Sequence, residues 1–362
     1  SGGAINTGII KYTAEYYEDA EKQRGIWRTA GRLVLICSFI FAPLIILFNV
    51  QLSSYIFNTE KYRSVFIWFA IFLIFFNFNA LFLAILNGKK EIVKLVIANI
   101  LGSVFSLVIT SMLAIQYQLY GALVALSIYQ SLAFFVTLIL CYRATWFKLS
   151  YLFGKIDPSI TKRLGAFVVM ALVSAVCVPL SQIAIRYYLT KEFSLEYAGY
   201  WEAMIRLSAT YLMLVTTTLS VYYLPRLSEL TNIIDIKKEV YRGYQFIFPL
   251  ALIAGLFVYL CRDLIIRILF TDSFLPMEQL FLWQMIGDAL KIGSWILAFL
   301  MLSKAMTKLF VITEILFAIS SVVLTIAGTK LFGFEGVSIA HIVNYAVYWI
   351  FMAVFVFKRL RE

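Results

Sequence analysis

Charged residues are scarce in this chain of 362 residues, and histidine occurs once. Lys, Arg, Asp and Glu together make up 14% of the sequence, against about 25% in an ordinary globular domain. The four cysteines show no CxxC spacing: they are Cys37, Cys141, Cys177 and Cys261. Their spacing argues against a disulfide framework and against a zinc site, so we expect neither a metal nor a cofactor. One histidine also leaves little acid–base equipment for an enzyme near neutral pH.

Apolar residues take the place of the missing charge. They make up 62% of the chain, aromatic residues make up 17%, and the mean hydropathy is +0.88. These values exclude a disordered chain and disfavour a soluble fold. The net charge of +11 does not indicate a nucleic-acid partner, because the basic residues are interspersed with apolar runs long enough to cross a membrane. The composition predicts a polytopic membrane protein.

Ten apolar runs have the length of about 20 residues that a spanning helix needs, and short polar segments separate them. No run shows the strict alternation of a transmembrane barrel strand. The runs lie at roughly 33–50, 65–86, 95–115, 119–141, 164–185, 199–224, 244–261, 280–302, 309–327 and 336–357. Residues 1–17 resemble the end of another span, so we expect the N-terminal helix of the fold to be missing from this chain.

The distribution of Lys and Arg predicts the orientation of these spans. When the connections are assigned alternately to the two sides of the membrane, 22 of the 31 basic residues fall on one side and 7 on the other. Basic residues are concentrated in cytoplasmic connections. We therefore expect a cytoplasmic C-terminus.

The two halves of the chain resemble each other. Three short matches have nearly constant offsets of 213, 215 and 214 residues: Tyr55–Glu60 with Ile268–Ser273, Leu119–Gln130 with Phe334–Tyr345, and Lys94-Leu95 with Lys308-Leu309. The offset covers an even number of spans, so the halves are parallel repeats, a plan known from transporters. The predicted fold is all-α, with two six-helix bundles around a central cavity.

The connection 142–163 is the predicted boundary between these bundles. It gives an N-terminal transmembrane bundle at 1–150 and a C-terminal bundle at 151–362. Aromatic side chains alternate with five basic residues in this connection. This pattern favours a segment that lies on the inner membrane surface, and the alternative is a solvated linker.

Ionisable residues occur inside the predicted spans of the second half, where each costs about 2.5–3.5 kcal/mol at the bilayer centre. They are Glu202, Arg206, Asp288, Lys291, Glu314 and His341. Glu202 and Arg206 are four residues apart, and Asp288 and Lys291 three, so each pair shares a helix face. One interpretation is a set of self-neutralising pairs buried for structure. The other is a water-filled cavity in which bases bind an anion and acids respond to protons.

His341 also has two interpretations. It could titrate near neutral pH and bind the proton that drives transport. The alternative is a hydrogen bond between helices that serves packing alone.

Four segments carry a family resemblance: Asn6–Tyr17, Leu149–Leu152, Ser220–Thr231 and Phe281–Gly293, with YLPRLSELT and GDALK the most specific stretches. They resemble the Wzx-type polysaccharide flippases, and above all the translocases of enterobacterial common antigen (lipid III) and of O-antigen. The superfamily also contains the multidrug and toxin extrusion (MATE) exporters. The resemblance implies twelve helices in two bundles, and transfer of an undecaprenyl-pyrophosphate-linked oligosaccharide from the cytoplasmic to the periplasmic leaflet.

The first hypothesis is therefore a flippase of the bacterial inner membrane that works by alternating access and is not an enzyme. Arg206 and Lys291 would bind the pyrophosphate, with Lys11 as a third cation. The acids Asp288, Glu314 and Glu202 would couple transport to protons or position the cations. The expected partners are the lipid-linked glycan, the bilayer, and polymerase and chain-length proteins of the same pathway, with no nucleic acid.

Two other hypotheses remain. A cation-coupled drug exporter of the MATE type would favour acids without matching bases, which the paired bases here disfavour. A membrane-embedded polymerase, ligase or acyltransferase would need a sizeable catalytic loop or a His/Asp constellation. The longest predicted periplasmic loop, 262–279, contains no histidine.

Overall fold

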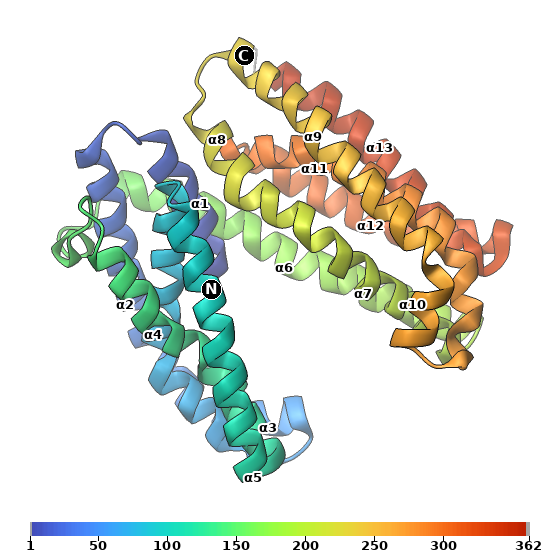
Figure 1. Cartoon of the computed structure of the whole chain (residues 1–362), viewed down its shortest axis with the longest axis horizontal. Helices are drawn as coiled ribbons and strands as arrows, with labels where there is room; N and C mark the ends of the chain where they lie inside the picture. The colour runs from blue at the N-terminus through green and yellow to red at the C-terminus, as the bar shows by residue number, and fades with distance from the viewer. Residues whose placement is uncertain (1, 360–362) are drawn as a thin grey trace. The chain divides into compact units, whose positions relative to one another are not determined.

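The computed structural model describes residues 2–359, and every regular element within this range is helical (Figure 1). Eight helical stretches among these residues are long and apolar enough to cross a membrane. Two of them, Ile92–Tyr142 and Thr307–Val356, each contain two of the runs found in the sequence. The ten predicted spans are thus all helical, and the chain is a multi-pass membrane protein.

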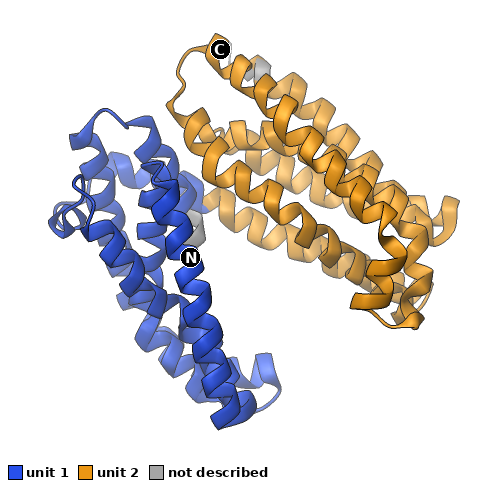
Figure 2. Cartoon of the chain, viewed as in Figure 1, with its two compact units in different colours: residues 1–168 blue, residues 169–362 orange. Residues whose placement is uncertain are grey.

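The chain divides into two compact units, residues 1–168 and residues 169–362 (Figure 2). The helices of the first unit are α1 (Gly2–Glu15), α2 (Ala20–Leu47), α3 (Asn49–Phe57), η1 (Glu60–Tyr62), α4 (Arg63–Gly88), α5 (Ile92–Tyr142) and η2 (Leu149–Leu152). The next helix, α6 (Pro158–Glu192), begins in the first unit and ends in the second.

The remaining helices belong to the second unit. They are α7 (Leu195–Thr218), the π-helical turn η3 (Leu219–Tyr223), α8 (Leu224–Glu229), α9 (Ile233–Leu260), α10 (Arg262–Leu269), η4 (Asp272–Leu280), α11 (Phe281–Ser303), α12 (Thr307–Phe332), η5 (Gly333–Glu335) and α13 (Gly336–Arg359).

Polar side chains start several of these helices. Asp19 accepts a hydrogen bond from the backbone N–H of Lys22 at the start of α2, and Asn232 accepts one from Ile234 at the start of α9. Ser194 does the same for α7. Such caps satisfy backbone donors that the first turn of a helix leaves unpaired. They fix where these helices begin.

One helix lies at the centre of each unit. In the first unit α4 packs against α1, α2 and α5, and in the second α11 packs against α9 and α13. In the helical stretches that contain α4 and α11, 56% and 61% of the most apolar 18-residue segment is buried. In the other six candidate spans this share does not exceed 28%. Helices α4 and α11 are therefore the most deeply buried of the long helices in their units.

The backbone repeats itself between the units with an offset of 215 residues. Lys90, in the turn from α4 to α5, has a φ of 57°, and Ala305, in the turn from α11 to α12, has a φ of 52°. Gln118, at a break inside α5, has φ 52° and ψ −135°, and Gly333, between α12 and α13, has φ 64° and ψ −147°. Positive φ is uncommon outside glycine, so these matches support the predicted duplication.

At each of these two breaks, a glycine packs closely against the backbone of the preceding helix. A side chain on Gly121 would lie 1.8 Å from the carbonyl oxygen of Leu113, and one on Gly336 would lie 2.1 Å from that of Gly328. Each glycine thus approaches the backbone eight positions earlier. Glycine is required at both positions, because any other residue would collide with the preceding helix.

The connection 142–163 packs against α2 in the first unit. Leu152 is fully buried, and a side chain on Gly31 would lie 2.5 Å from its carbonyl oxygen. Arg32 donates a hydrogen bond from Nη1 to the carbonyl oxygen of Gly154 at 2.8 Å. Tyr142 remains largely exposed beside this buried part. Contact of the connection with a membrane surface stays a prediction.

A polar cluster joins this connection to the turn between α4 and α5. Trp146 donates from its indole N–H to Oε1 of Glu91 at 2.8 Å, and Nζ of Lys94 lies 3.2 Å from the same oxygen. Burial alone would raise the pKa of the Glu91 carboxyl. The bonds from Trp146 and Lys94 outweigh burial and hold that pKa below its usual value.

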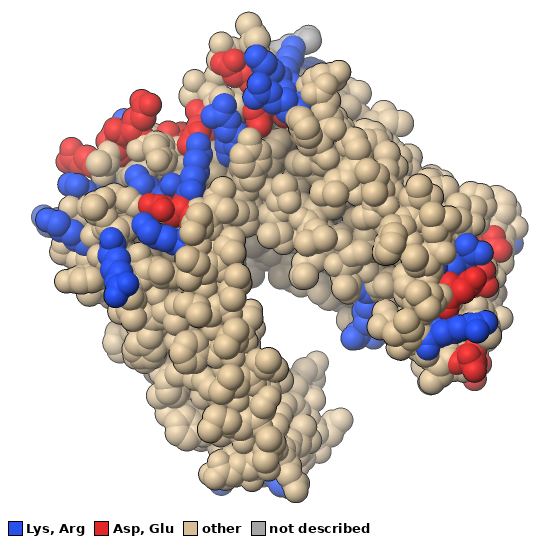
Figure 3. Space-filling view, in the orientation of Figure 1, with Lys and Arg blue, Asp and Glu red and all other residues tan. Residues whose placement is uncertain are grey.

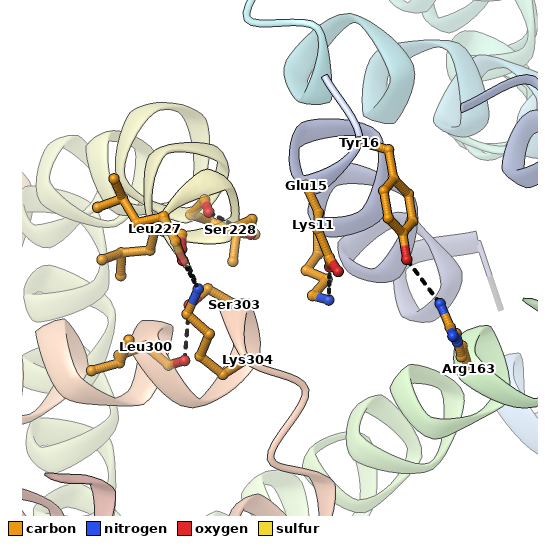
Figure 4. A network of polar contacts seen from close by, with 11 residues as sticks. Lys11, Glu15, Tyr16, Arg163, Leu227, Ser228, Leu300, Ser303 and Lys304 are labelled. Atoms are coloured by element: carbon orange, nitrogen blue, oxygen red, sulfur yellow. Dashed lines mark hydrogen bonds and ion pairs between the residues drawn. The ribbon is translucent and has the colours of Figure 1, made fainter. Parts of the chain in front are cut away.

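Charged side chains gather toward the ends of the helices in both units, and surface without charged side chains separates them (Figure 3). Figure 4 shows one such end of α11, where Lys304 donates from Nζ to the carbonyl oxygen of Leu227 at 2.8 Å. Lys304 is the C-cap residue of α11. Its contact ties the YLPRLSELT stretch to the end of that helix and places a cation where the helix dipole favours one.

Candidate functional site

One buried carboxylate and its hydrogen-bond partners lie in the core of the second unit. Asp288 in α11 is completely buried. It accepts a hydrogen bond from the Tyr211 hydroxyl of α7 at 2.8 Å and one from Nε2 of Gln284 at 3.2 Å. Nε2 of His341 in α13 lies 3.0 Å from its Oδ1. A buried carboxylate needs such partners, because an unpaired charge in the interior is strongly destabilising.

The surroundings of His341 hold its ring against α11. A side chain on Gly287 would lie 2.3 Å from Cδ2 of His341, so glycine leaves the space that the imidazole occupies. The ring also contacts Tyr345 edge-on, with centroids 4.8 Å apart. Ser338, on the same helix, donates to Oε1 of Gln284 at 3.3 Å. The sequence therefore builds the pair of Asp288 and His341 into a connected network of three helices.

Lys291 lies one turn from Asp288, at the edge of this network. Its Nζ is 5.0 Å from the ring centre of Trp295 and 5.6 Å from that of Tyr345. Aromatic faces attract a cation at such distances. Lys291 is only partly buried. It is therefore a cation held by rings beside a buried acid, and its ammonium group has donors left for a ligand.

A second charged group lies on the surface of the same unit. Nε of Arg206 is 3.0 Å from Oε1 of Glu202 on α7, and Arg186 of α6 pairs with the other oxygen of Glu202. The side chain of Arg206 is 78% exposed. The buried residues of α7 include Met204 and Ser208, so Arg206 lies on the opposite side of the helix from the core.

The remaining candidates lie apart from these two groups. Glu314 on α12 is half-buried and interacts with Ser174 of α6. Lys11 belongs to the first unit, where it is buried and pairs with Glu15 (Figure 4). Its Nζ lies 4.0 Å from the ring centre of Tyr12. Lys11 is thus already neutralised within its own helix.

The sequence pattern does not identify three residues of these groups. Tyr211 and Gln284 carry no charge and look like ordinary residues of apolar helices, although both bind Asp288. Arg186 lies one residue beyond the predicted span at 164–185, whereas α6 continues for six residues after it. One property of the sequence points to Arg186: an arginine near the end of a span has a side chain long enough to contact residues deeper in the membrane.

Metal binding has no support among the described residues: no three of their His, Cys, Asp and Glu side chains lie close enough to hold an ion. All four cysteines are free thiols. The candidate groups comprise carboxylates, cations, one imidazole and a tyrosine hydroxyl. Such groups can bind anions and exchange protons.

Comparison with known proteins places this chain in a family. The model of the polysaccharide biosynthesis protein family matches residues 18–279. The chain belongs to this family. It is 29% identical over 318 residues to the lipid III flippases of Escherichia coli K12 and Shigella flexneri, which covers 87% of this chain and 76% of each relative. The resemblance to flippases of this type is confirmed.

Solved structures agree with the predicted fold. The bent form of the Vibrio cholerae MATE transporter VcmN matches with a TM-score of 0.86 at 14% identity, covering 99% of this chain and 85% of that one. A MOP superfamily transporter from Pyrococcus furiosus matches with a TM-score of 0.80 at 14% identity, covering 100% and 85%. The predicted all-α transporter fold is confirmed.

Proposed function

We propose that this chain transfers undecaprenyl-pyrophosphate-linked oligosaccharides from the cytoplasmic to the periplasmic leaflet of the bacterial inner membrane. Family membership and 29% identity to the lipid III flippase of E. coli K12 support this function. The glycan is the repeat unit of O-antigen or of enterobacterial common antigen. The transfer proceeds by alternating access, and the C-terminus lies in the cytoplasm.

Arg206 is the residue on which this function depends most. It lies eleven residues from the start of α7, about 16 Å along the helix and near the middle of a bilayer. Its side chain is 78% exposed. A guanidinium exposed to lipid at that depth is unfavourable, so its surface must face water. A polar path through the membrane is what an anionic, glycosylated lipid headgroup requires.

The candidate residues divide into two roles. Arg206 and Lys291 bind the pyrophosphate through charge-assisted hydrogen bonds, and Lys11 contributes once it separates from Glu15. Asp288 and His341 exchange the coupling proton, with Glu202 and Glu314 as further acids. The lipid-linked glycan passes on to polymerase and chain-length proteins of the same pathway.

Complementation tests this function. The chain, expressed in a strain that lacks its own flippase, should restore surface polysaccharide. Arg206→Ala and Lys291→Ala should each reduce it about tenfold at equal protein levels, and Arg267→Ala, an exposed arginine of α10, should not. Normal polysaccharide in both variants would refute the cation role.

A MATE-type drug exporter is the second candidate, because the fold neighbours include MATE transporters. Such a protein should protect cells against organic cations. Drug susceptibility of the same complemented strain separates the two functions. Protection against drugs without restored polysaccharide would favour the exporter.

A further inference from the structure

Two arginines from neighbouring helices converge on one carboxylate in the second unit. Glu202 on α7 pairs through Oε1 with Nε of Arg206 at 3.0 Å and through Oε2 with Nη2 of Arg186 on α6. Each oxygen of the carboxylate is therefore held by a different guanidinium. We call these three residues the arginine pair and its carboxylate.

The arginine pair has binding capacity beyond Glu202. A guanidinium carries five N–H donors, and the contact of each arginine with Glu202 is made through one nitrogen. The side chains of Arg186 and Arg206 are 48% and 78% exposed, whereas that of Glu202 is 26% exposed. The three groups together carry a net charge of +1. An oxyanion that approaches this surface meets positive charge and free donors.

The depth of the pair places it on the route of a lipid headgroup. Arg186 is six residues from the end of α6, about 9 Å along the helix, and Arg206 is about 16 Å from the start of α7. The two helices are joined by a short turn, so both distances run inward from the same side of the membrane. The pair therefore extends from the middle of the bilayer toward one surface.

We propose that Arg186 and Arg206 form one site for the diphosphate of the lipid-linked substrate, and that Glu202 is its internal competitor. Two guanidiniums that hold the two oxygens of one carboxylate are spaced to hold neighbouring oxygens of a diphosphate. Glu202 occupies donors that the diphosphate needs and so limits its affinity. A transport site must release its ligand as well as bind it. This inference rests on the proposed function for the identity of the ligand.

Binding to the purified chain in nanodiscs tests the site, with undecaprenyl diphosphate as the probe and undecaprenol as the uncharged control. Arg186→Gln and Arg206→Gln should each weaken binding of the diphosphate about tenfold, the effect of losing one charge-assisted hydrogen bond at an exposed site. Glu202→Gln should strengthen it several-fold, because the competitor is gone. Binding of undecaprenol should not change. Arg267→Gln is the matched control, an exposed arginine elsewhere in the same unit.

Three results would overturn the proposal. Unchanged affinity in Arg186→Gln, with a normal elution profile, would remove Arg186 from the site. Weaker binding in Glu202→Gln would show that Glu202 positions the arginines and does not compete. Competition by glucuronate as strong as by inorganic pyrophosphate would assign the pair to a sugar carboxylate and not to the diphosphate.

Conservative variants keep these tests interpretable if a glutamine variant fails to fold. Arg186→Lys and Arg206→Lys retain the charge but not the guanidinium donors, and should keep more affinity than the glutamine variants and less than the wild type. Complementation separates this site from the proposed function. If the chain restores polysaccharide but both glutamine variants bind the diphosphate normally, the flippase function stands and the site is refuted. If the variants show the expected binding pattern but the chain does not restore polysaccharide, the site stands and the flippase function is refuted.

Discussion

Asp288 and His341 are 53 residues apart in the sequence, yet their side chains meet at 3.0 Å in the interior of the second unit. The carboxylate is completely buried and the imidazole is 16% exposed. Tyr211 and Gln284 complete the partners of the carboxylate. The carboxylate thus links α7, α11 and α13, so the loss of either member of this pair removes a polar contact between α11 and α13.

Removal of the carboxylate should destabilise the protein. Asp288→Ala leaves Tyr211, Gln284 and His341 without their common acceptor, and should lower the free energy of unfolding by about 1–3 kcal/mol. Thermal unfolding of the purified protein in detergent measures this. Asp263→Ala, an exposed carboxylate on α10, should have no measurable effect. Equal melting temperatures for the two variants would show that the buried network contributes nothing to stability.

Gly287 controls the position of His341. In Gly287→Ala the new methyl group would lie 2.3 Å from Cδ2 of the imidazole, so the ring must move away from α11. We expect a loss of stability of about 1–3 kcal/mol, the usual effect of overpacking, and a marked loss of surface polysaccharide. Gly199→Ala on α7 is the control, because nothing lies within 4 Å of the added carbon. If both alanines behave alike, the contact with His341 does not constrain the ring.

The positions of the spans and the duplication could be predicted from the sequence because both depend on local patterns. An apolar run of spanning length specifies a helix by itself. The repeat could be read from short matches such as Lys94 with Lys308, and the shared positive φ of Lys90 and Ala305 agrees with it. Such features are set by neighbours along the chain.

The composition of the candidate site could be predicted only in part. Asp288, Lys291 and His341 attract attention because ionisable residues are rare in membrane helices. Tyr211 meets Asp288 only because α7 packs against α11, and Arg186 meets Glu202 only because α6 lies beside α7. No spacing in the sequence predicts that packing. A self-neutralising pair of Asp288 with Lys291, one of the two interpretations of the sequence, illustrates this limit: the acid pairs with His341, and the lysine lies over aromatic rings.

The duplication predicts the effect of a substitution at the break in α5. Gln118 has the backbone conformation that its counterpart Gly333 has, with positive φ and ψ near −140° (−135° and −147°). A residue with a side chain is strained there. Gln118→Gly should raise the free energy of unfolding by about 1 kcal/mol, and Gly333→Ala should lower it by a similar amount. Chemical denaturation in mild detergent measures both. The two substitutions must change the stability in opposite directions. A loss of stability in Gln118→Gly would contradict the equivalence of Gln118 and Gly333.

Glu91 should give the stability of the first unit a dependence on pH. Its pKa is held below the usual value because the bonds from Trp146 and Lys94 favour the ionised form, although burial opposes it. A carboxyl whose pKa is lower in the folded state stabilises that state above the unfolded pKa, and the contribution disappears as the pH falls through the folded pKa.

The comparison of the wild type with Glu91→Gln measures this contribution. At pH 7 the variant should be less stable by about 1 kcal/mol, since its amide still accepts from Trp146 but no longer pairs with Lys94. The difference should shrink as the pH falls below the usual glutamate range of about 4.3. Glu18→Gln, at an exposed position, should match the wild type at every pH. A difference between wild type and Glu91→Gln that stays constant to low pH would mean that the ionised carboxylate is not the stabilising form.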